Sequence, residues 1–411
     1  TYAVPIALPA ARGGAQPSLS LGYSSSAGHG IAGLGWDLGV PYISRQTDRG
    51  VPGYDDPGFG GPWHPNQDRF VFNGGQELVP ICLVSGTTCS TALPGEVMPT
   101  WAGGWQYFRP RVEGSFLRFF WSPDHKSWRV QSKSGETMEL GVPSDDATDT
   151  NALESDPSQP AQIFRWNLSR QYDAQRSKGS GAAPVNVVKY RYRLDQGVSY
   201  LSDIYDTPPT TSAAAPLSAW AHHTHLRFDG RTDPTFSYRR GWKTTTTLRI
   251  AGIDVASKTW QGGPAAAREL VQRYHLSYDA SSHVSLLQSV TVEGSCAGAT
   301  EGASELAAAT DCPRLPSMTF GYQHVEGFDP KGRPRTSDLP GYEAFDERVR
   351  SLGGSPDFSV DDELTDLFDI NADALPDVLV TAGGTFKGSH SVYFNGQGGR
   401  VDTFGAAQKM P

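Results

Sequence analysis

Short runs in which apolar and polar residues alternate recur along most of the chain. The stretch 17–26 shows the pattern first, with Leu19, Leu21 and Tyr23 alternating against serine and glycine. A period of two indicates a half-buried β-strand, because successive side chains of a strand point to opposite faces. Further runs of strand length occur at 42–45, 69–72, 77–80, 116–121, 128–131, 136–140, 164–168, 187–194, 199–205, 223–228, 246–253, 268–278, 285–292 and 317–322. Since helical periodicity is nearly absent, the pattern predicts an all-β protein.

Turn-forming residues separate these runs. The chain has 46 glycines and 30 prolines among its 411 residues, a composition typical of many short strands joined by turns. Asn73-Gly74 lies between two of the runs and is the strongest local hairpin signal. The sequence therefore predicts multi-stranded antiparallel sheets with a sandwich-like packing.

Two stretches without periodicity divide the chain. Residues 143–160 are acidic and rich in proline and serine, and residues 326–342 combine proline, glycine and mixed charges. Both are expected to be connections. The predicted organisation is a β-domain whose first part spans 1–142 and whose second part spans 161–325, linked by 143–160. After the connection 326–342, a separate unit is expected over 343–411.

Residues 369–377 have the spacing of a calcium-binding loop. Oxygen-bearing side chains stand at every second position and a further acid follows, and the predicted ligands are Asp369, Asn371, Asp373, the carbonyl of Leu375, and Asp377. Calcium prefers such sets of six or seven oxygens. An EF-hand is rejected, because that motif needs glycine and glutamate where Ala374 and Gly383 stand. The alternative is a solvated acidic turn between two strands.

The four cysteines fall into two local pairs, Cys82 with Cys89 and Cys296 with Cys312. Each pair brackets a loop of small residues, so two disulfides are expected, although four cysteines permit three connectivities and four reduced thiols remain an alternative. Disulfides persist in oxidising compartments. Together with extracellular calcium they predict a secreted, extracellular protein.

Charge and hydropathy exclude two kinds of partner. The formal net charge of −9 provides no basic field for phosphates, so nucleic acid is not expected. No apolar run approaches the length of about 18 residues that a membrane-spanning helix needs. The chain is expected to start as a mature or trimmed protein, since it does not open on a charged-then-apolar leader.

Candidate catalytic chemistry is sparse. The sequence Gly28-His-Gly-Ile-Ala-Gly33 formally matches a dinucleotide fingerprint, but strand-like runs follow where that motif needs a helix. Of the histidines His222, His223 and His225, the last two would share one face of a strand and could bind zinc or copper. No nearby cysteine or carboxylate completes a tetrahedral site, and ordinary surface histidines are the more common explanation. The acids at 361–363 could be paired catalytic carboxylates, with a solvated turn as the simpler reading. We therefore expect no enzyme activity and no catalytic residues.

Several runs together resemble a known family. Val4-Pro-Ile-Ala-Leu-Pro9, Gln16 to Ser25, Gly33-Leu-Gly-Trp36 and Ile43 to Thr47 are similar, in order, to the opening of the SpvB-like N-terminal region. Plasmid virulence protein B of Salmonella, the B components of Tc insecticidal toxins and Rhs-type secreted proteins share this region. Later runs continue the likeness at 68–70, 77–80, 164–168, 188–192, 200–204 and 274–278, and 369–377 resembles the calcium loop of FG-GAP or VCBS propeller blades, as in integrin α chains.

The resemblance implies a role in virulence as a toxin scaffold. In Tc-type relatives this region begins a hollow β-shell that encloses a toxic segment, and an inserted propeller docks the shell onto an A-type component. This chain would then be the first wall of the shell followed by one blade of a β-propeller, within a larger toxin or Rhs polypeptide. Blades of this kind usually carry glycine at the place of Ala374, which implies weaker calcium affinity here.

The resemblance also suggests ADP-ribosyl transfer, since virulence protein B carries such a domain at its far end. The Glu-x-Glu pair of that chemistry is missing from this chain. The alternative function is a calcium-dependent extracellular adhesion or carbohydrate-binding module. It rests on the calcium loop and on tryptophans that could stack on sugars, namely Trp63, Trp101, Trp105, Trp220 and Trp242.

Overall fold

The computed structural model resolves the chain into two compact units, Thr1–Gln323 and His324–Pro411. It describes all residues except 57–66, 82, 86–87, 91–94, 179–181, 210–213, 260–262, 264, 281–283, 297, 303–310, 323–352, 355, 361–363, 374, 382–384, 397–402 and 411, and it describes only the backbone of 83–85 and 88–90. The described residues confirm the all-β prediction, since their only helical segments are two short 3₁₀ turns, Thr100–Ala102 and Leu217–Ala219.

Eight strands of the first unit form a closed antiparallel barrel. Around the barrel they follow the order β6 (Tyr42–Arg45), β7 (Phe70–Phe72), β8 (Gln76–Pro80), β11 (Gln106–Pro110), β12 (Arg118–Trp121), β13 (Ser127–Gln131), β14 (Thr137–Gly141) and β16 (Ile163–Tyr172). The barrel closes because β16 pairs with β6 along one edge and with β14 along the other. The sequence predicted sheets packed like a sandwich, so the closed barrel is a correction to that packing.

The turn between β7 and β8 has the conformation that its sequence predicts. Asn73 and Gly74 both have positive φ, 51° and 73°, and the amide of Gly75 donates to the carbonyl of Phe72 at 3.3 Å, as in a turn of type I′. The two strands pair antiparallel from Phe70 opposite Leu78 to Phe72 opposite Gln76.

Aromatic side chains fill the barrel. Phe70, Phe108, Trp121, Trp128 and Trp166 are all fully buried, and their rings pack against one another with centroids 4.9–6.4 Å apart. An eight-stranded barrel has an interior just wide enough for side chains to fill it. Large aromatic rings at inward positions therefore suit a solid barrel core rather than a channel.

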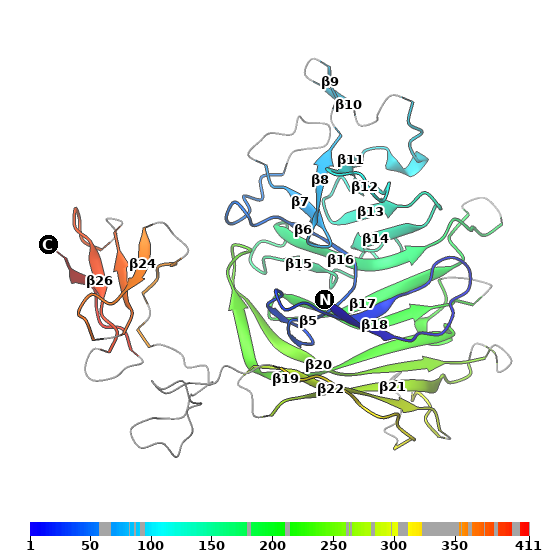
Figure 1. Ribbon diagram of the computed structural model, residues 1–411. Helices are drawn as coiled ribbons and strands as arrows, with labels where there is room; N and C mark the ends of the chain where they lie inside the picture. Colours follow the sequence, from blue (N-terminus) through cyan, green and yellow to red (C-terminus); the bar gives the residue numbers. More distant parts are fainter. Residues whose placement is uncertain are drawn as a thin grey trace. The chain divides into compact units, whose positions relative to one another are not determined.

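The sheet continues beyond the barrel through β16 (Figure 1). The added strands are β17 (Val187–Asp195), β18 (Val198–Asp206), β19 (His222–Ser237), β20 (Thr244–Ser257), β21 (Glu269–Tyr278), β22 (Leu287–Gly294) and β23 (Met318–Thr319), each antiparallel to the one before. β19 and β20 extend well past the predicted runs 223–228 and 246–253. They pair with each other along most of their length, with irregularities near Arg227 and Gly230 that break the apolar alternation.

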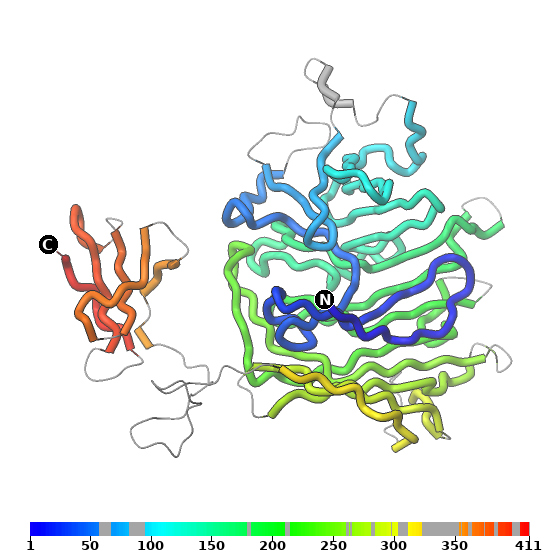
Figure 2. Tube along the Cα trace, in the orientation of Figure 1, coloured from blue at the N-terminus to red at the C-terminus, as the bar shows by residue number. Residues whose placement is uncertain are grey.

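The N-terminal segment crosses this extended sheet (Figure 2). It forms a three-stranded sheet of β1 (Tyr2–Ile6), β2 (Leu19–Tyr23) and β5 (Trp36–Leu38), and a small hairpin of β3 (His29–Gly30) and β4 (Gly33–Leu34). The strands at 29–34 replace the helix that a dinucleotide fingerprint would open. Val4, Leu21 and Trp36 share one apolar core with the barrel and with Ile253 and Val290 of the large sheet.

The segment 143–160 differs from the exposed connection that its composition predicted. Its residues Leu153–Ser155 form β15, which pairs with the first part of β16, and Ala152 and Leu153 join the main core. Only three residues of the segment pair, which is too few to show a period in the sequence. One continuous sheet therefore connects the residues on both sides of this segment.

Two further sheets complete the described structure. The short hairpin of β9 (Leu83–Ser85) and β10 (Thr88–Ser90) lies within the first unit. The second unit is a four-stranded antiparallel sheet in chain order, made of β24 (Thr365–Phe368), β25 (Asp377–Val380), β26 (Ser391–Tyr393) and β27 (Gln408–Lys409). It packs around Val378, Val380 and Phe404. The described residues form this single sheet and no closed propeller.

Candidate functional site

The predicted calcium loop connects β24 to β25. Side-chain oxygens of Asp369 and Asn371 both accept a hydrogen bond from the amide of Asp373, at 3.1 Å in each case. The carboxylate of Asp373 accepts from the amide of Leu375 and from the Asn371 side chain, both at 2.8 Å. The side-chain oxygens of Asp369, Asn371 and Asp373 thus all lie around the same backbone turn. An all-oxygen set of this kind fits calcium.

Asp377, the last predicted side-chain ligand, is buried at the start of β25. Its two carboxylate oxygens accept hydrogen bonds from the amides of Ile370 and Asn395, at 3.0 and 2.8 Å. Asp377 therefore also connects the loop to the segment that follows β26. Ala374 lies outside the described residues, whereas Ala372 has a φ of 59°, a conformation that costs energy for a residue other than glycine.

A disulfide joins Cys296 and Cys312, as predicted. It closes a loop that folds back onto the sheet, where the amide of Cys312 donates to the buried carboxylate of Glu293 at 3.3 Å. Leu270 and Ala299 pack against the bridge. The other predicted pair involves Cys82, which lies outside the described residues, and Cys89, whose side chain is also outside them.

Breaking this disulfide is expected to destabilise the first unit. Closing a loop of about fifteen residues is worth roughly 3 kcal/mol in the chain-entropy model, so the double variant Cys296→Ser/Cys312→Ser should lose about that much free energy of unfolding. Urea unfolding of both proteins, without reductant, measures the difference. A loss below about 1 kcal/mol would contradict the entropic account.

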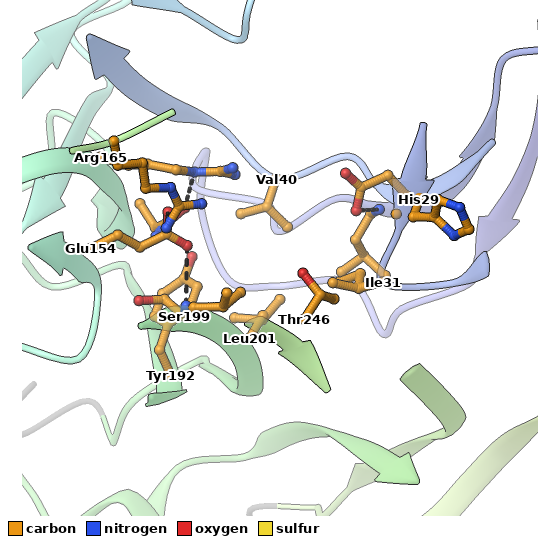
Figure 3. A pocket seen from close by; sticks show the side chains of 15 residues that line it. His29, Ile31, Val40, Glu154, Arg165, Tyr192, Ser199, Leu201 and Thr246 are labelled. Carbon is orange, nitrogen blue, oxygen red and sulfur yellow. Dashed lines mark hydrogen bonds and ion pairs between the residues drawn. The ribbon is translucent and has the colours of Figure 1, made fainter. Parts of the chain in front are cut away.

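A pocket of about 180 Å³ lies where the N-terminal segment meets the large sheet (Figure 3). Figure 3 shows Arg165 and Glu154 at one end, His29 at the other, and Val40 and Leu201 between them. Glu154 is held by Arg240 at 2.9 Å and accepts a hydrogen bond from the amide of Ser199 at 3.1 Å. The carboxylate of Glu154 in β15 therefore connects that strand to β18 and to Arg240, which lies between β19 and β20.

A second polar cluster fixes the hairpin β3–β4 to the sheet. Asp233 accepts from the amide of Ser285 at 2.7 Å and pairs with Arg231 at 3.2 Å, while Arg231 donates to the carbonyl of Gly30 at 2.8 Å. Burial by itself raises the pKa of Asp233, but the hydrogen bonds from Arg231 and Ser285 outweigh burial and lower the pKa to about 2.

This cluster predicts a specific loss of stability in acid. The folded-state pKa of Asp233 lies below its ordinary value of 3.8, so its contribution is complete above that value and is lost as the pH falls toward about 2. Asp233→Asn should remove this part of the decline in unfolding free energy between pH 5 and pH 2, measured by urea unfolding. Asp229→Asn, which changes an exposed aspartate of the same strand, should retain it. Equal pH profiles for Asp233→Asn and the parent protein would refute the assignment.

The barrel mouth holds a buried arginine that the sequence did not single out. The guanidinium of Arg45 donates to Asp56 at 2.6 and 2.7 Å, to Asp68 at 2.7 Å and to the carbonyl of Ile163 at 2.7 Å. The ring of Tyr54 lies 4.8 Å from the guanidinium carbon. No local pattern indicates this role, because the partners come from a loop and from another strand.

The three histidines at 222–225 do not share one role. His223 and His225 face the same side of β19, and both meet Asp203 of β18, at 2.9 and 2.7 Å. His222 points to the opposite side and contacts Asp206 at 2.6 Å. The sequence suggested a metal site at 223 and 225 but found no carboxylate to complete it, because Asp203 becomes a neighbour only through the pairing of β18 with β19.

The tryptophans that could have stacked on sugars are mostly packed against protein. Trp220 is fully buried in a small cluster with Tyr172 and Tyr205, and Trp242 is nearly so. Trp101 and Trp105 are half-buried, and both rings lie near the Arg129 guanidinium carbon, at 4.7 and 4.9 Å. Trp63 and the acids at 361–363 lie outside the described residues. Trp220 and Trp242 are therefore not available to a ligand.

The closed barrel, continued into one long antiparallel sheet, defines the first unit as an all-β domain. The family model described as Salmonella virulence plasmid 65kDa B protein matches residues 1–214. These residues include the whole barrel together with β17 and β18. The chain belongs to this SpvB family.

Solved structures share the fold at low sequence identity. The N-terminal domain of effector protein SpvB from Salmonella typhimurium strain LT2 superposes with a TM-score of 0.52 at 21% identity, covering 71% of this chain and 98% of that domain. A chain of the Photorhabdus luminescens Tc holotoxin pore matches 100% of this chain with a TM-score of 0.56 and 21% sequence identity. A chain in the crystal structure of TcdB2–TccC3–Cdc42 matches 99% of this chain with a TM-score of 0.56 and 20% sequence identity. The chain spans only 19% of the length of each of these two Tc chains.

No curated protein matches the chain in sequence. Within the described part of the chain, no helix has the length and apolar character needed to cross a membrane.

Proposed function

We propose that this chain is the N-terminal wall of the β-shell of a secreted Tc-type or Rhs-type toxin, and that its role is structural rather than enzymatic. The observation that carries the proposal is the extent of the fold match. The matches to the Tc-type chains cover 99–100% of this chain, and therefore residues of both units. The family shared with SpvB supports the same assignment over residues 1–214.

The construction of the first unit suits a wall. One apolar core runs from the three-stranded N-terminal sheet through the barrel to β22. On the other side of the large sheet, buried ion pairs connect neighbouring strands, such as Asp254 with Arg273 at 2.7 Å. A sheet held on both faces in this way resists local opening. Rigidity of this kind is what a protein that encloses a toxic segment requires.

We further propose that the second unit is one blade of an FG-GAP-type propeller that docks a partner, for which a Tc A-type component is the best candidate. Its four antiparallel strands follow chain order, which is the arrangement of a propeller blade. A propeller needs roughly four to eight such blades. The remaining blades and the enclosed segment would then belong to a larger polypeptide.

The proposal is tested by the mass and architecture of the protein that the source organism exports. We expect an intact mass several times 44.3 kDa, and electron microscopy should reveal a hollow particle whose wall contains this barrel. Limited proteolysis of that particle should spare an internal segment until the shell is denatured. A stable exported protein of about 44.3 kDa, with no larger form, would refute the shell role.

Calcium is proposed to bind the loop between β24 and β25. The protein should then melt at a higher temperature in millimolar calcium than in chelator, because a ligand of the folded state stabilises it, by about 2.7 kcal/mol at one hundred times its dissociation constant. Differential scanning calorimetry measures the shift. Asp369→Ala should abolish it with little change in chelator.

The choice of variant matters for this test. Asp377→Ala should also remove the calcium shift, but it should lower stability even in chelator, since it deprives the amides of Ile370 and Asn395 of their acceptor. Asp366→Ala changes an exposed acid of β24 outside the loop and serves as the control. Equal melting temperatures with and without calcium in the parent protein would exclude a calcium site.

A further inference from the structure

Three side chains of the types that can bind metal ions lie close together on one face of β18 and β19. Asp203 lies directly opposite His225 in the strand pairing, and His223 is two residues away on the same face. The ligand atoms of Asp203, His223 and His225 all lie within 4.8 Å of one another. Two imidazoles and one carboxylate form a donor set that suits zinc and similar divalent transition metals.

The surroundings hold His223 in a ligand-ready orientation. Its Nδ1 lies 2.8 Å from the carboxylate of Glu301, and its ring stacks on Tyr205 with centroids 4.3 Å apart and planes inclined by 2°. A carboxylate at one ring nitrogen fixes the tautomer in which the other nitrogen is free to bind a metal. This leaves Nε2 of His223, which points at Asp203, as the ligand atom.

Glu301 is itself fixed by a buried arginine. The guanidinium of Arg268 donates to the second oxygen of Glu301 at 2.7 Å and to the carbonyl of Trp220 at 2.8 Å. Glu301 also lies in the loop that the disulfide Cys296–Cys312 closes. The position of the Glu301 carboxylate is therefore fixed both by its ion pair with Arg268 and by the loop that the disulfide closes.

We propose that Asp203, His223 and His225 form a binding site for a zinc-class divalent metal ion, with Glu301 as the residue that positions His223. The ligand atoms are Nε2 of His223, Nδ1 of His225 and a carboxylate oxygen of Asp203, and water completes a tetrahedron. The ion would connect β18 to β19 and, through Glu301, to the disulfide loop. This inference does not depend on the proposed shell role.

Two of the three ligand separations are close to those that a zinc ion requires. Zinc ligands at about 2.0–2.1 Å in a tetrahedron stand roughly 3.3 Å apart. The two nitrogens now lie 2.9 and 2.7 Å from the Asp203 oxygen, so each separation widens by about half an ångström. His225 also lines an open hollow of about 560 Å³ with Ser202 and Arg227, which gives an ion and a water molecule access.

The same contacts permit a metal-free alternative, in which a proton replaces the ion. Burial by itself lowers the pKa of His223, but hydrogen bonds to Asp203 and Glu301 outweigh burial and raise the pKa. An imidazolium between two carboxylates would then link the strands without any metal. Direct measurement of metal binding separates the two states.

The test is titration of the untagged chain with Zn²⁺ by isothermal calorimetry, in excess calcium so that the loop at 369–377 does not contribute. We expect one equivalent to bind, and Co²⁺ to give the visible absorption bands of a tetrahedral site. His225→Ala should weaken binding on the order of 100-fold or more, and Glu301→Gln by roughly 10–100-fold. The matched control His222→Ala changes the neighbouring histidine on the opposite face and should bind like the parent.

Each outcome is informative. His225 is partly exposed, whereas His223 is buried, so His225→Ala is the variant expected to fold, and circular dichroism in chelator checks this. No bound equivalent in the parent, or unchanged affinity in His225→Ala, would overturn the site and leave the imidazolium arrangement. Unchanged affinity in Glu301→Gln would overturn the positioning role.

Discussion

Replacing Trp128 by alanine is expected to lower the free energy of unfolding by about 3–5 kcal/mol, the usual cost of removing a large aromatic side chain from a core. Trp128 is fully buried at the centre of the barrel. Its ring stacks on Trp121 at 5.4 Å and contacts Phe70 and Phe108 at 5.2 and 5.0 Å. The barrel is closed by strand pairing, so its wall cannot collapse into the cavity that the variant leaves.

Urea unfolding followed by circular dichroism measures this loss. Trp105→Ala provides a control of the same residue type, because Trp105 packs half-buried on the outside of the barrel against Trp101 and Arg129. Trp105→Ala should lower the free energy of unfolding clearly less than Trp128→Ala does. Trp128→Phe should also be less destabilising than Trp128→Ala, because phenylalanine fills part of the cavity. If Trp128→Ala and Trp105→Ala were equally destabilising, the barrel interior would not be the tightly packed core described here.

Replacing Arg45 by methionine is expected to cost a similar 3–5 kcal/mol, for an electrostatic reason. Removing one partner of a buried ion pair leaves the other charge without compensation in a medium that solvates it poorly. Arg45 is buried, and it faces both Asp56 and Asp68. Two carboxylates would therefore lose their counter-charge, and their mutual repulsion would open the barrel mouth.

A surface ion pair provides the comparison. Arg111 is 62% exposed and pairs with Glu77 at 2.9 Å, and such pairs contribute about 0–1 kcal/mol. Arg111→Met should therefore leave the midpoint of urea unfolding nearly unchanged, whereas Arg45→Met should lower it strongly. The triple variant Arg45→Met/Asp56→Asn/Asp68→Asn should regain part of the stability, because no charge then remains buried. A triple variant no better than Arg45→Met would show that lost packing, rather than unpaired charge, is the cause.

Local sequence patterns predicted most of the strands. β7 and β8 form as expected because Asn73 and Gly74 tolerate the positive φ that their turn needs. Alternation located β13 and β14 to within about a residue. It underestimated β19 and β20, which extend because each supplies the other with backbone partners, and such pairing does not require alternating apolar residues. It also missed β15, whose three residues depend on the edge of β16.

The candidate sites likewise fall into those whose residues are close together in the chain and those whose residues are brought together only by folding. The loop at 369–377 is recognisable because its ligands are contiguous, and the disulfide Cys296–Cys312 because its cysteines are close in the chain. In contrast, Asp203 is 22 residues from His225, and Glu301 is 78 residues from His223. No spacing rule connects residues so far apart, so the cluster became visible only through the pairing of β18 with β19 and the return of the disulfide loop.

The sequence by itself determined the all-β class, the positions of most strands, the resemblance to the SpvB family and the local disulfide, because each depends on residues close together in the chain. Only the tertiary structure decided that eight strands close into a barrel, that Arg45 is buried at its mouth, and that Asp203 completes a histidine pair. The physical reason is that the backbone hydrogen bonds between strands are the same for nearly all residue types, with proline as the exception because it has no N–H donor. Which strands meet is therefore decided by the fit of side chains across the whole core, and that fit is a property of the folded chain.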